Sequence, residues 1–292
     1  MCERYKDRRF ALPVNLEQGL FLVTAFPSAP AHGERRFGRF NRIGFQTLLG
    51  KEVRRFLKVY QQTLLAPAGT ALLFMAVFTL AIGSRRGDVF GVPFAHFLAP
   101  GILMMAVLQN AFANASSSIV VAKVQGNIID VLMPPLSAGE LTTAYALGGV
   151  VRGLAVAAVA AVIIFPFAWS GIAHPLWALS FAVVGALIFS LCGAITGIWA
   201  EKFDHTALVT NFVITPLAFL SGTFYSIRIL PEPWQTISAI NPVHFMIDGF
   251  RYGIIGQSDS SPWLGMAISV ALAGFLFWLC HRMFSTGYRL KS

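Results

Sequence analysis

The chain has 292 residues, of which 56% are hydrophobic and only 12% are charged, and its formal net charge is +9. Soluble domains carry about 25% charged residues, so this chain has too few charges to keep a globular surface dissolved. Its mean hydropathy of +0.67 agrees. A nucleic-acid-binding protein would explain the positive charge but not the 26 phenylalanines, and three widely spaced cysteines exclude a disulfide scaffold. The composition indicates an integral membrane protein without a nucleic-acid partner.

Six charge-poor stretches are each long enough to cross a bilayer of about 30 Å as a helix. Their apolar residues do not alternate with the period of two that a strand shows, and helices satisfy every backbone polar group inside lipid. We therefore expect an all-α membrane protein with a transmembrane domain at residues 63–287. Its six spans are predicted at about residues 64–83, 94–121, 141–169, 173–199, 206–227 and 263–281.

The distribution of basic residues predicts the orientation of the chain. An even number of spans places both termini on one side of the membrane. Residues 1–63 hold 12 of the 22 Lys and Arg residues, and residues 282–292 hold three more. Because cytoplasmic segments are enriched in Lys and Arg, both termini are predicted to be cytoplasmic, although Arg85 and Arg86 lie in an opposite loop.

Two segments precede the first span. Residues 1–43 mix charges with Pro and Gly without a period, which is typical of a flexible cytoplasmic extension; a misassigned start codon would give the same pattern. In residues 44–62, apolar side chains recur every three or four positions, while basic residues such as Lys51 and Arg54 occupy other faces. This pattern predicts an amphipathic interface helix on the membrane surface, or a plain anchor for the first span.

Two loops carry short helices of their own. In the loop after the second span, Ile128, Val131 and Leu132 share one side of a helix that two prolines end. Either a partner protein or the chain's own membrane helices must cover this side. Residues 243–255, between the fifth and sixth spans, are apolar but too short to cross, which predicts a re-entrant or interfacial helix.

The sequence contains no nucleotide-binding or ion-coupling motif. The closest approach to a phosphate-binding loop begins at Gly44, has five residues before Gly50 instead of four, and ends in Glu52. The six histidines are scattered. No chain of Asp, Glu or His runs through the predicted spans, as an ion-coupled carrier would require.

A few polar residues do lie within the predicted spans. Arg152 sits in the third span between Gly149 and Gly153, where a charge at mid-span costs about 2.5–3.5 kcal/mol. It either pairs with another group or lines a pathway, or it extends toward the cytoplasmic head groups, and the sequence favours the last of these interpretations. Asn110 and Asn114 share one face of the second span, where they line a translocation surface or hydrogen-bond to neighbouring helices. Here also the second interpretation is favoured.

Several motifs follow one another in order along the six predicted spans. They are Lys51-Glu-Val-Arg-Arg-Phe, Ala99-Pro-Gly-Ile-Leu-Met-Met, Gly126-Asn-Ile-Ile-Asp-Val-Leu-Met-Pro-Pro-Leu-Ser, Gly148-Gly-Val-Val-Arg-Gly, Thr215-Pro-Leu-Ala-Phe-Leu-Ser-Gly-Thr-Phe-Tyr-Ser, Leu230-Pro-Glu-Pro-Trp and Asn241-Pro-Val-His-Phe-Met-Ile-Asp-Gly-Phe-Arg-Tyr-Gly. In this order, the chain from about residue 44 to its C-terminus resembles the ABC-2 type permease family, the membrane subunits of bacterial ABC exporters. Residues 1–43 lie outside the resemblance.

The resemblance implies a non-enzymatic subunit of an exporter in the bacterial inner membrane. Such a permease binds no cofactor itself; ATP binds to a separate cytoplasmic ATPase subunit, and two permeases form a homodimer in the membrane lipid. The substrate is expected to be a drug, a lipid or a polysaccharide-like molecule. Residues 44–62, 124–135 and 231–255 would be the interface helix, the coupling helix and the extracellular gate helices.

The resemblance also suggests which residues act in coupling and transport. The expected contacts with the ATPase are Gln125, Asn127, Ile128, Asp130, Leu132, Lys51 and Arg54. The residues that could line the pathway are Asn110, Asn114 and Arg152.

Two other classes of function stay open at this point. A membrane-embedded lipid-modifying enzyme would need clustered acidic or histidine residues near one membrane face, and residues 201–205 are the one such cluster in the sequence. That cluster is short, and a solvated loop is the favoured explanation of it. An ion-coupled secondary carrier would need inverted repeats and an ion site within the membrane.

Overall fold

The structure is a computed structural model that describes residues 40–83, 88–89, 91–168, 171–229 and 231–290. Of the extension predicted for residues 1–43, residues 1–39 lie outside the described residues. The elements in chain order are α1 (Arg42–Lys58), η1 (Gln61–Leu65), α2 (Ala66–Phe78), η2 (Thr79–Gly83), α4 (Phe94–Val124), α5 (Ile128–Leu132), α6 (Ala138–Ala168), α7 (Pro175–Trp199), α8 (Phe203–Val209), η3 (Thr210–Ile214), α9 (Thr215–Leu220), η4 (Ile227–Ile229), α10 (Trp234–Ile240), α11 (Pro242–Ile255) and α12 (Pro262–Thr286).

Six helices in the described part of the chain are long and apolar enough to cross a membrane. They cover Gln61–Ala81, Phe94–Val124, Ala138–Ala168, Pro175–Trp199, Phe203–Leu220 and Pro262–Thr286. No strand occurs in the described ranges. The predicted all-α class and the predicted count of six spans are therefore confirmed.

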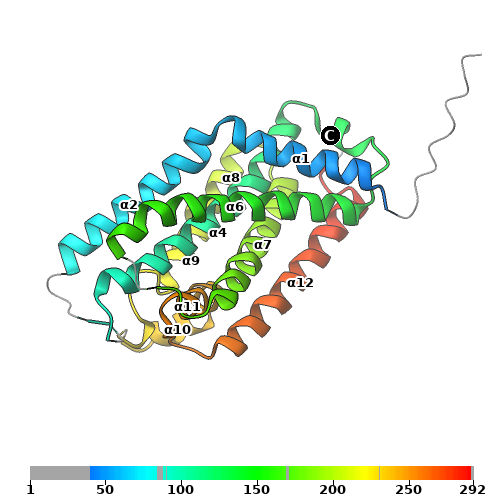
Figure 1. The fold of residues 1–292 in the computed structure, drawn as a ribbon. Coiled ribbons are helices and arrows are strands. Elements are labelled where there is room, and N and C mark those ends of the chain that lie inside the picture. The colour runs from blue at the N-terminus through cyan, green and yellow to red at the C-terminus, as the bar shows by residue number, and fades with distance from the viewer. Residues whose placement is uncertain (1–39, 84–87, 90, 169–170, 230, 291–292) are drawn as a thin grey trace, which may run out of the picture. The chain divides into compact units, whose positions relative to one another are not determined.

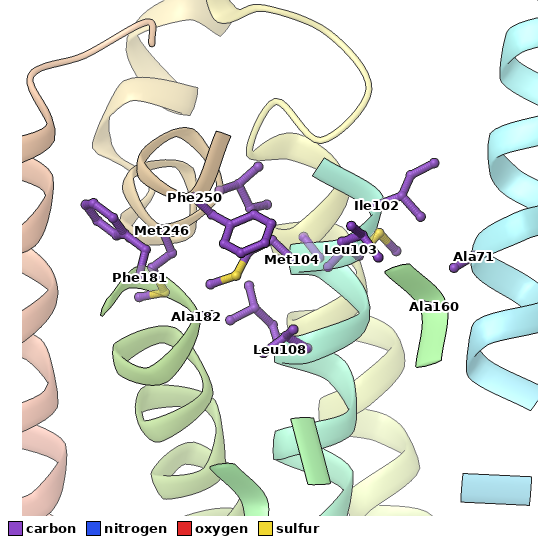
Figure 2. Close-up of a cluster of buried hydrophobic side chains, with 14 of the residues drawn as sticks. Ala71, Ile102, Leu103, Met104, Leu108, Ala160, Phe181, Ala182, Met246 and Phe250 are labelled. Atoms are coloured by element: carbon purple, nitrogen blue, oxygen red, sulfur yellow. The ribbon is translucent and has the colours of Figure 1, made fainter. Parts of the chain in front are cut away.

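The second span, α4, is the central helix of the bundle (Figure 1) and is mostly buried. It packs against α2, α6, α7 and α11. The close-up of the apolar core shows side chains of α4, α7 and α11 meeting one another (Figure 2); they include Leu103, Met104, Leu108, Phe181, Ala182, Met246 and Phe250. Because α4 touches so many neighbours, a displacement of α4 must be accommodated across the bundle.

Two glycines allow α4 to approach its neighbours closely. A Cβ on Gly193 of α7 would collide with the carbonyl oxygen of Phe112. A Cβ on Gly149 of α6 would lie 2.8 Å from the carbonyl oxygen of Ala111. Small residues at such positions are typical of helix pairs in membranes, because dispersion contacts between backbones replace the hydrophobic effect there.

The first and fifth spans share an irregular construction. Each contains a π-helical turn that ends two residues before a proline: η1 precedes Pro67, and η3 precedes Pro216. A proline lacks the N–H donor and its ring clashes with the carbonyl four residues earlier, so the helix widens at that point. The fifth span ends at Leu220, earlier than the predicted residue 227, because the chain turns at Gly222 with a φ of +79°.

The short helices gather at the two ends of the bundle (Figure 1). At one end, Leu48 of α1, Ile128 of α5 and Phe284 of α12 belong to one buried apolar cluster. At the other end, α10 and α11 lie near the start of α7, whose His174 N–H donates to Gly253 O of α11 at 2.8 Å. The chain therefore has one end built around α1 and α5 and an opposite end built around α10 and α11.

Candidate functional site

A cavity of about 410 Å³ lies between the first, second and fifth spans. Its polar groups belong to Gln62, Thr70, Gln109, Asn110, Thr210 and Thr215. None of the described residues that line it is charged, and apolar side chains form the rest of its wall. Both π-helical turns, η1 and η3, contribute to this wall, and such turns are frequent at functional sites. A largely apolar cavity with a few polar groups is typical of a small-molecule site.

The structure brings two of the predicted pathway residues together, Asn110 and Arg152. Arg152 Nη2 donates to Asn110 Oδ1 at 3.2 Å, and Asn110 Nδ2 donates to Ala106 O at 3.0 Å. Arg152 is therefore directed across to α4 and does not extend along α6 toward the head groups. Since Asn110 lines the cavity, Arg152 stands directly behind the cavity wall.

The third predicted pathway residue, Asn114, lies one turn farther along α4 and contacts α1 instead. Arg55 Nη2 donates to Asn114 O at 2.7 Å and to Asn114 Oδ1 at 3.1 Å, and Arg55 Nη1 donates to Ser117 Oγ at 3.1 Å. The fully buried Glu52 accepts a hydrogen bond from Ser118 Oγ at 2.5 Å and forms an ion pair with Arg55 at 3.3 Å. We name these five residues the α1–α4 polar cluster.

Glu52 is a functional candidate that the sequence analysis did not single out. Leu48, Glu52 and Phe56 are the three buried residues of α1, and they are spaced four apart on one face. The sequence carries a signal for this: an acidic residue on the apolar face of a helix predicts a buried carboxylate with a polar partner. Lys51 and Arg54, which the sequence analysis assigned to the ATPase contact, are exposed on the other faces of α1.

The predicted coupling segment exposes some of its residues and buries others. Gln125, Asn127 and Asp130 are exposed, Leu132 is half-buried, and Ile128 packs inward against the cluster that contains Leu48. The segment presents two further apolar side chains that the sequence analysis did not assign, Ile129 at 57% exposure and Met133 at 77%. The role of these residues in partner binding stays a prediction.

A buried carboxylate joins the start of α1 to the end of the coupling segment. Glu140 Oε2 accepts from Ser137 N at 2.6 Å, and Ser137 Oγ accepts from Glu140 N at 3.2 Å, which is a capping box at the start of α6. Glu140 Oε1 also accepts a hydrogen bond from Asn41 N, and Asn41 Nδ2 donates to Pro135 O at 3.2 Å. The Ser-x-x-Glu spacing signals the cap, but the link to Asn41 is tertiary and has no local signal.

At the opposite end of the bundle, Asp248 holds the loop that joins α11 to α12. Its carboxylate accepts from the backbone N–H groups of Asp259 and Ser260, both at 2.8 Å, and lies 3.9 Å from Arg251. His244 Nε2 lies 2.9 Å from Ser260 Oγ. Burial lowers the pKa of the His244 imidazole, although the neighbouring Asp248 carboxylate acts in the opposite direction. This cluster fixes the loop to α11.

The acidic and histidine residues at positions 201–205 lie in the bend before α8 and in the first residues of that helix. Glu201, Lys202 and Asp204 are exposed, and Glu201 forms an ion pair with Arg289 at 3.5 Å. The geometry therefore gives this cluster a structural role in tying the loop to the C-terminal segment.

Six apolar spans in the described residues and a partly polar cavity among three of them are the features of a multi-pass membrane protein. Residues 43–255 match the family model described as ABC-2 type transporter. The chain belongs to the ABC-2 type transporter family. It is a transport subunit rather than an enzyme, and members of this family typically pair with an ATPase subunit.

The chain is similar to several bacterial membrane permeases and nodulation proteins. It is 38% identical over 256 residues to the inner membrane transport permease YadH of Escherichia coli (strain K12), an overlap of 86% of this chain and 98% of that protein. It is 26% identical over 181 residues to nodulation protein J of Rhizobium leguminosarum bv. viciae, covering 60% of this chain and 68% of that protein. Its identity to nodulation protein J of Rhizobium meliloti (strain 1021) is 23% over 205 residues, with 68% and 77% covered. The resemblance inferred from the sequence motifs is confirmed.

Proposed function

We propose that this chain is the membrane subunit of an ATP-driven exporter of the inner membrane. A separate cytoplasmic ATPase supplies the energy, and two copies of the chain enclose the substrate path. The α1–α4 polar cluster is the observation that carries this proposal. It links a helix whose exposed face is basic to the central helix of the bundle, one turn away from the cavity.

The exposed faces of α1 and α5 are suited to docking the ATPase. Lys51 and Arg54 supply positive charge on α1, and Asp130 lies exposed on α5. Ile129 and Met133 add apolar surface, and apolar side chains exposed together at a cytoplasmic end favour a protein partner. The excess of Lys and Arg in the terminal segments supports a cytoplasmic location for this end of the bundle.

A displacement of the coupling segment has a continuous route to the cavity. Glu140 ties the segment to the start of α1, so the two move together. Glu52 and Arg55 then hold α1 to α4. Gln109 and Asn110 of α4 line the cavity. ATP can drive transport through this route only if the ATPase contacts the segment differently in two states.

The first and fifth spans supply the surface for a second copy of the chain. Both spans are largely unburied within one copy. Alongside apolar side chains they expose Gln62 and Asn211, whose side-chain amides lipid would leave without hydrogen-bond partners. The cavity opens between these same spans. A homodimer would cover both surfaces and place the cavities on the path between the two copies.

An association experiment tests this proposal. We expect the tagged full chain, purified in nanodiscs, to retain an ATPase with a phosphate-binding loop, identified by mass spectrometry. Lys51→Glu with Arg54→Glu should weaken the association because it reverses the charge of the docking face. Lys202→Glu with Arg282→Glu is the matched control, since both residues are exposed and neither belongs to α1 or α5. Absence of an ATPase, or equal retention by both double variants, would overturn the proposal.

A further inference from the structure

Arg152 is a cation near the middle of a membrane span. It lies in α6, fourteen residues from Ala138 and sixteen from Ala168. At 1.5 Å per residue these separations are about 21 Å and 24 Å. The side chain turns toward α4, where Asn110 accepts its hydrogen bond. The membrane interior is costly for such a charge, and intramembrane charges are therefore functional candidates by default.

This cation has no counter-ion within the described chain. None of the ion pairs among the described residues involves Arg152. Its guanidinium makes one hydrogen bond, to Asn110 Oδ1, and its Nε is buried without a hydrogen-bond partner. The basic residue of the nearby polar cluster, Arg55, is already paired with Glu52. Arg152 therefore retains an uncompensated positive charge and unused donors.

The neighbouring cavity could hold a ligand whose negative charge compensates Arg152. Asn110 separates the guanidinium from the cavity, and no acidic residue lies among the described lining residues. The side-chain amides of Gln62 and Gln109 are free of hydrogen bonds to other described residues and line the same space. Apolar side chains such as Phe74 and Met105 complete the wall. The cavity thus offers donors and an apolar surface together with the field of a positive charge.

We propose that the cavity binds an amphiphile with an anionic head group, a phosphate or a carboxylate, and that Arg152 determines this preference. The head group accepts hydrogen bonds from the amide groups in the field of the guanidinium, which acts strongly at low dielectric. The apolar chain lies against the wall formed by α2 and α4. An amphiphile with a cationic head group is repelled. The inference rests on the proposed function only in taking the cavity as part of the substrate path.

Equilibrium binding to the full chain in phosphatidylcholine nanodiscs tests this inference, with empty nanodiscs subtracted. The probes are dodecyl phosphate, dodecanoate, dodecylglycerol and dodecyltrimethylammonium, which share a chain length and differ in head group. We expect both anionic probes to bind about tenfold more tightly than dodecylglycerol, as one charge-assisted hydrogen bond would give. Dodecyltrimethylammonium should bind most weakly. A stronger response to one anionic probe distinguishes a phosphate from a carboxylate head group.

Variants assign the preference to Arg152. Arg152→Gln should abolish the preference for anions, and Arg152→Lys should keep part of it. Lys58→Gln, which removes a charge from the exposed face of α1, should leave it unchanged. Gln62→Leu with Gln109→Leu keeps the arginine but removes the two amide groups that line the cavity, and should weaken the preference for anions. This double variant leaves a test available if Arg152→Gln fails to fold.

Measurements at high salt distinguish binding in the cavity from binding to the basic surface of the chain. At about 1 M salt the Debye length is about 3 Å, so anion binding to the exposed face of α1 should be lost while binding in the cavity persists. Equal affinity for all four probes, an anion preference that survives Arg152→Gln, or a preference that disappears at high salt would overturn the inference. Each of these results is independent of whether an ATPase associates with the chain, so the inference and the proposed function can fail separately.

Discussion

Glu52 on the surface helix α1 and Ser118 on the central span α4 are joined by a 2.5 Å hydrogen bond, and the glutamate is fully buried. Arg55, one turn along α1, completes the arrangement through its ion pair with Glu52 and its bonds to Asn114. A buried ion pair contributes little net stability, because desolvation offsets the attraction, and a role in fixing register is its best-attested use. We infer that this pair fixes the position of α1 on α4.

The first prediction separates stability from coupling at this pair. Glu52→Leu leaves Arg55 without its counter-ion and should lower the free energy of unfolding by about 1–3 kcal/mol. The loss is smaller than for a fully buried pair, because Arg55 is 31% exposed and keeps its bonds to Asn114. Glu52→Leu with Arg55→Leu should restore most of that loss, since an apolar pair needs no compensation. Thermal unfolding of the purified chain measures both effects. A double variant less stable than the single one would show that the pair itself stabilises the fold.

The same double variant should uncouple the cavity from the ATPase. A cysteine at Gln109 reports on the cavity, and in the complex its labelling rate by a maleimide should change when a non-hydrolysable ATP analogue is added. With both leucines in place the rate should no longer respond. In a Lys58→Gln variant, which changes only the exposed face of α1, the labelling rate should still change when the ATP analogue is added. An unchanged response in the double variant would remove Glu52 and Arg55 from the coupling route.

The Glu140 link predicts a local effect at the start of α1. Glu140→Gln weakens the bonds to Ser137 and Asn41 and should cost about 1–2 kcal/mol, the range of a lost helix cap. Hydrogen exchange of residues 42–48 should accelerate. Ser137→Ala also removes part of the cap but leaves Glu140 able to hold Asn41, so exchange in residues 42–48 should change much less. Equal acceleration in the two variants would argue against the link.

The close approach of α4 and α7 predicts opposite effects for two glycine substitutions. Gly193→Ala should destabilise the bundle by about 1–3 kcal/mol, because its Cβ collides with the Phe112 carbonyl. Gly274→Ala, in α12, meets no atom within 4 Å and should stabilise the chain by about 0.5–1 kcal/mol. The two midpoints of thermal unfolding should therefore move in opposite directions, and a shared direction would contradict the packing described here.

The six spans and the amphipathic α1 could be predicted because hydropathy and periodicity are local properties of the sequence. Glu52 carried a local signal as well, since it is in register with Leu48 and Phe56. The pairing of Arg152 with Asn110 and the inward direction of Ile128 could not be predicted, because they depend on which faces of distant helices meet. The cavity between the first, second and fifth spans could not be predicted for the same reason, because it depends on how distant helices pack.

ATP hydrolysis by the purified chain, with and without its associated ATPase, tests the central claim most directly. The account predicts no hydrolysis by the chain alone, and hydrolysis by the complex that falls when Lys51→Glu and Arg54→Glu disturb the docking face. Hydrolysis by the chain alone, or a complex whose hydrolysis is unaffected by these substitutions, would contradict it.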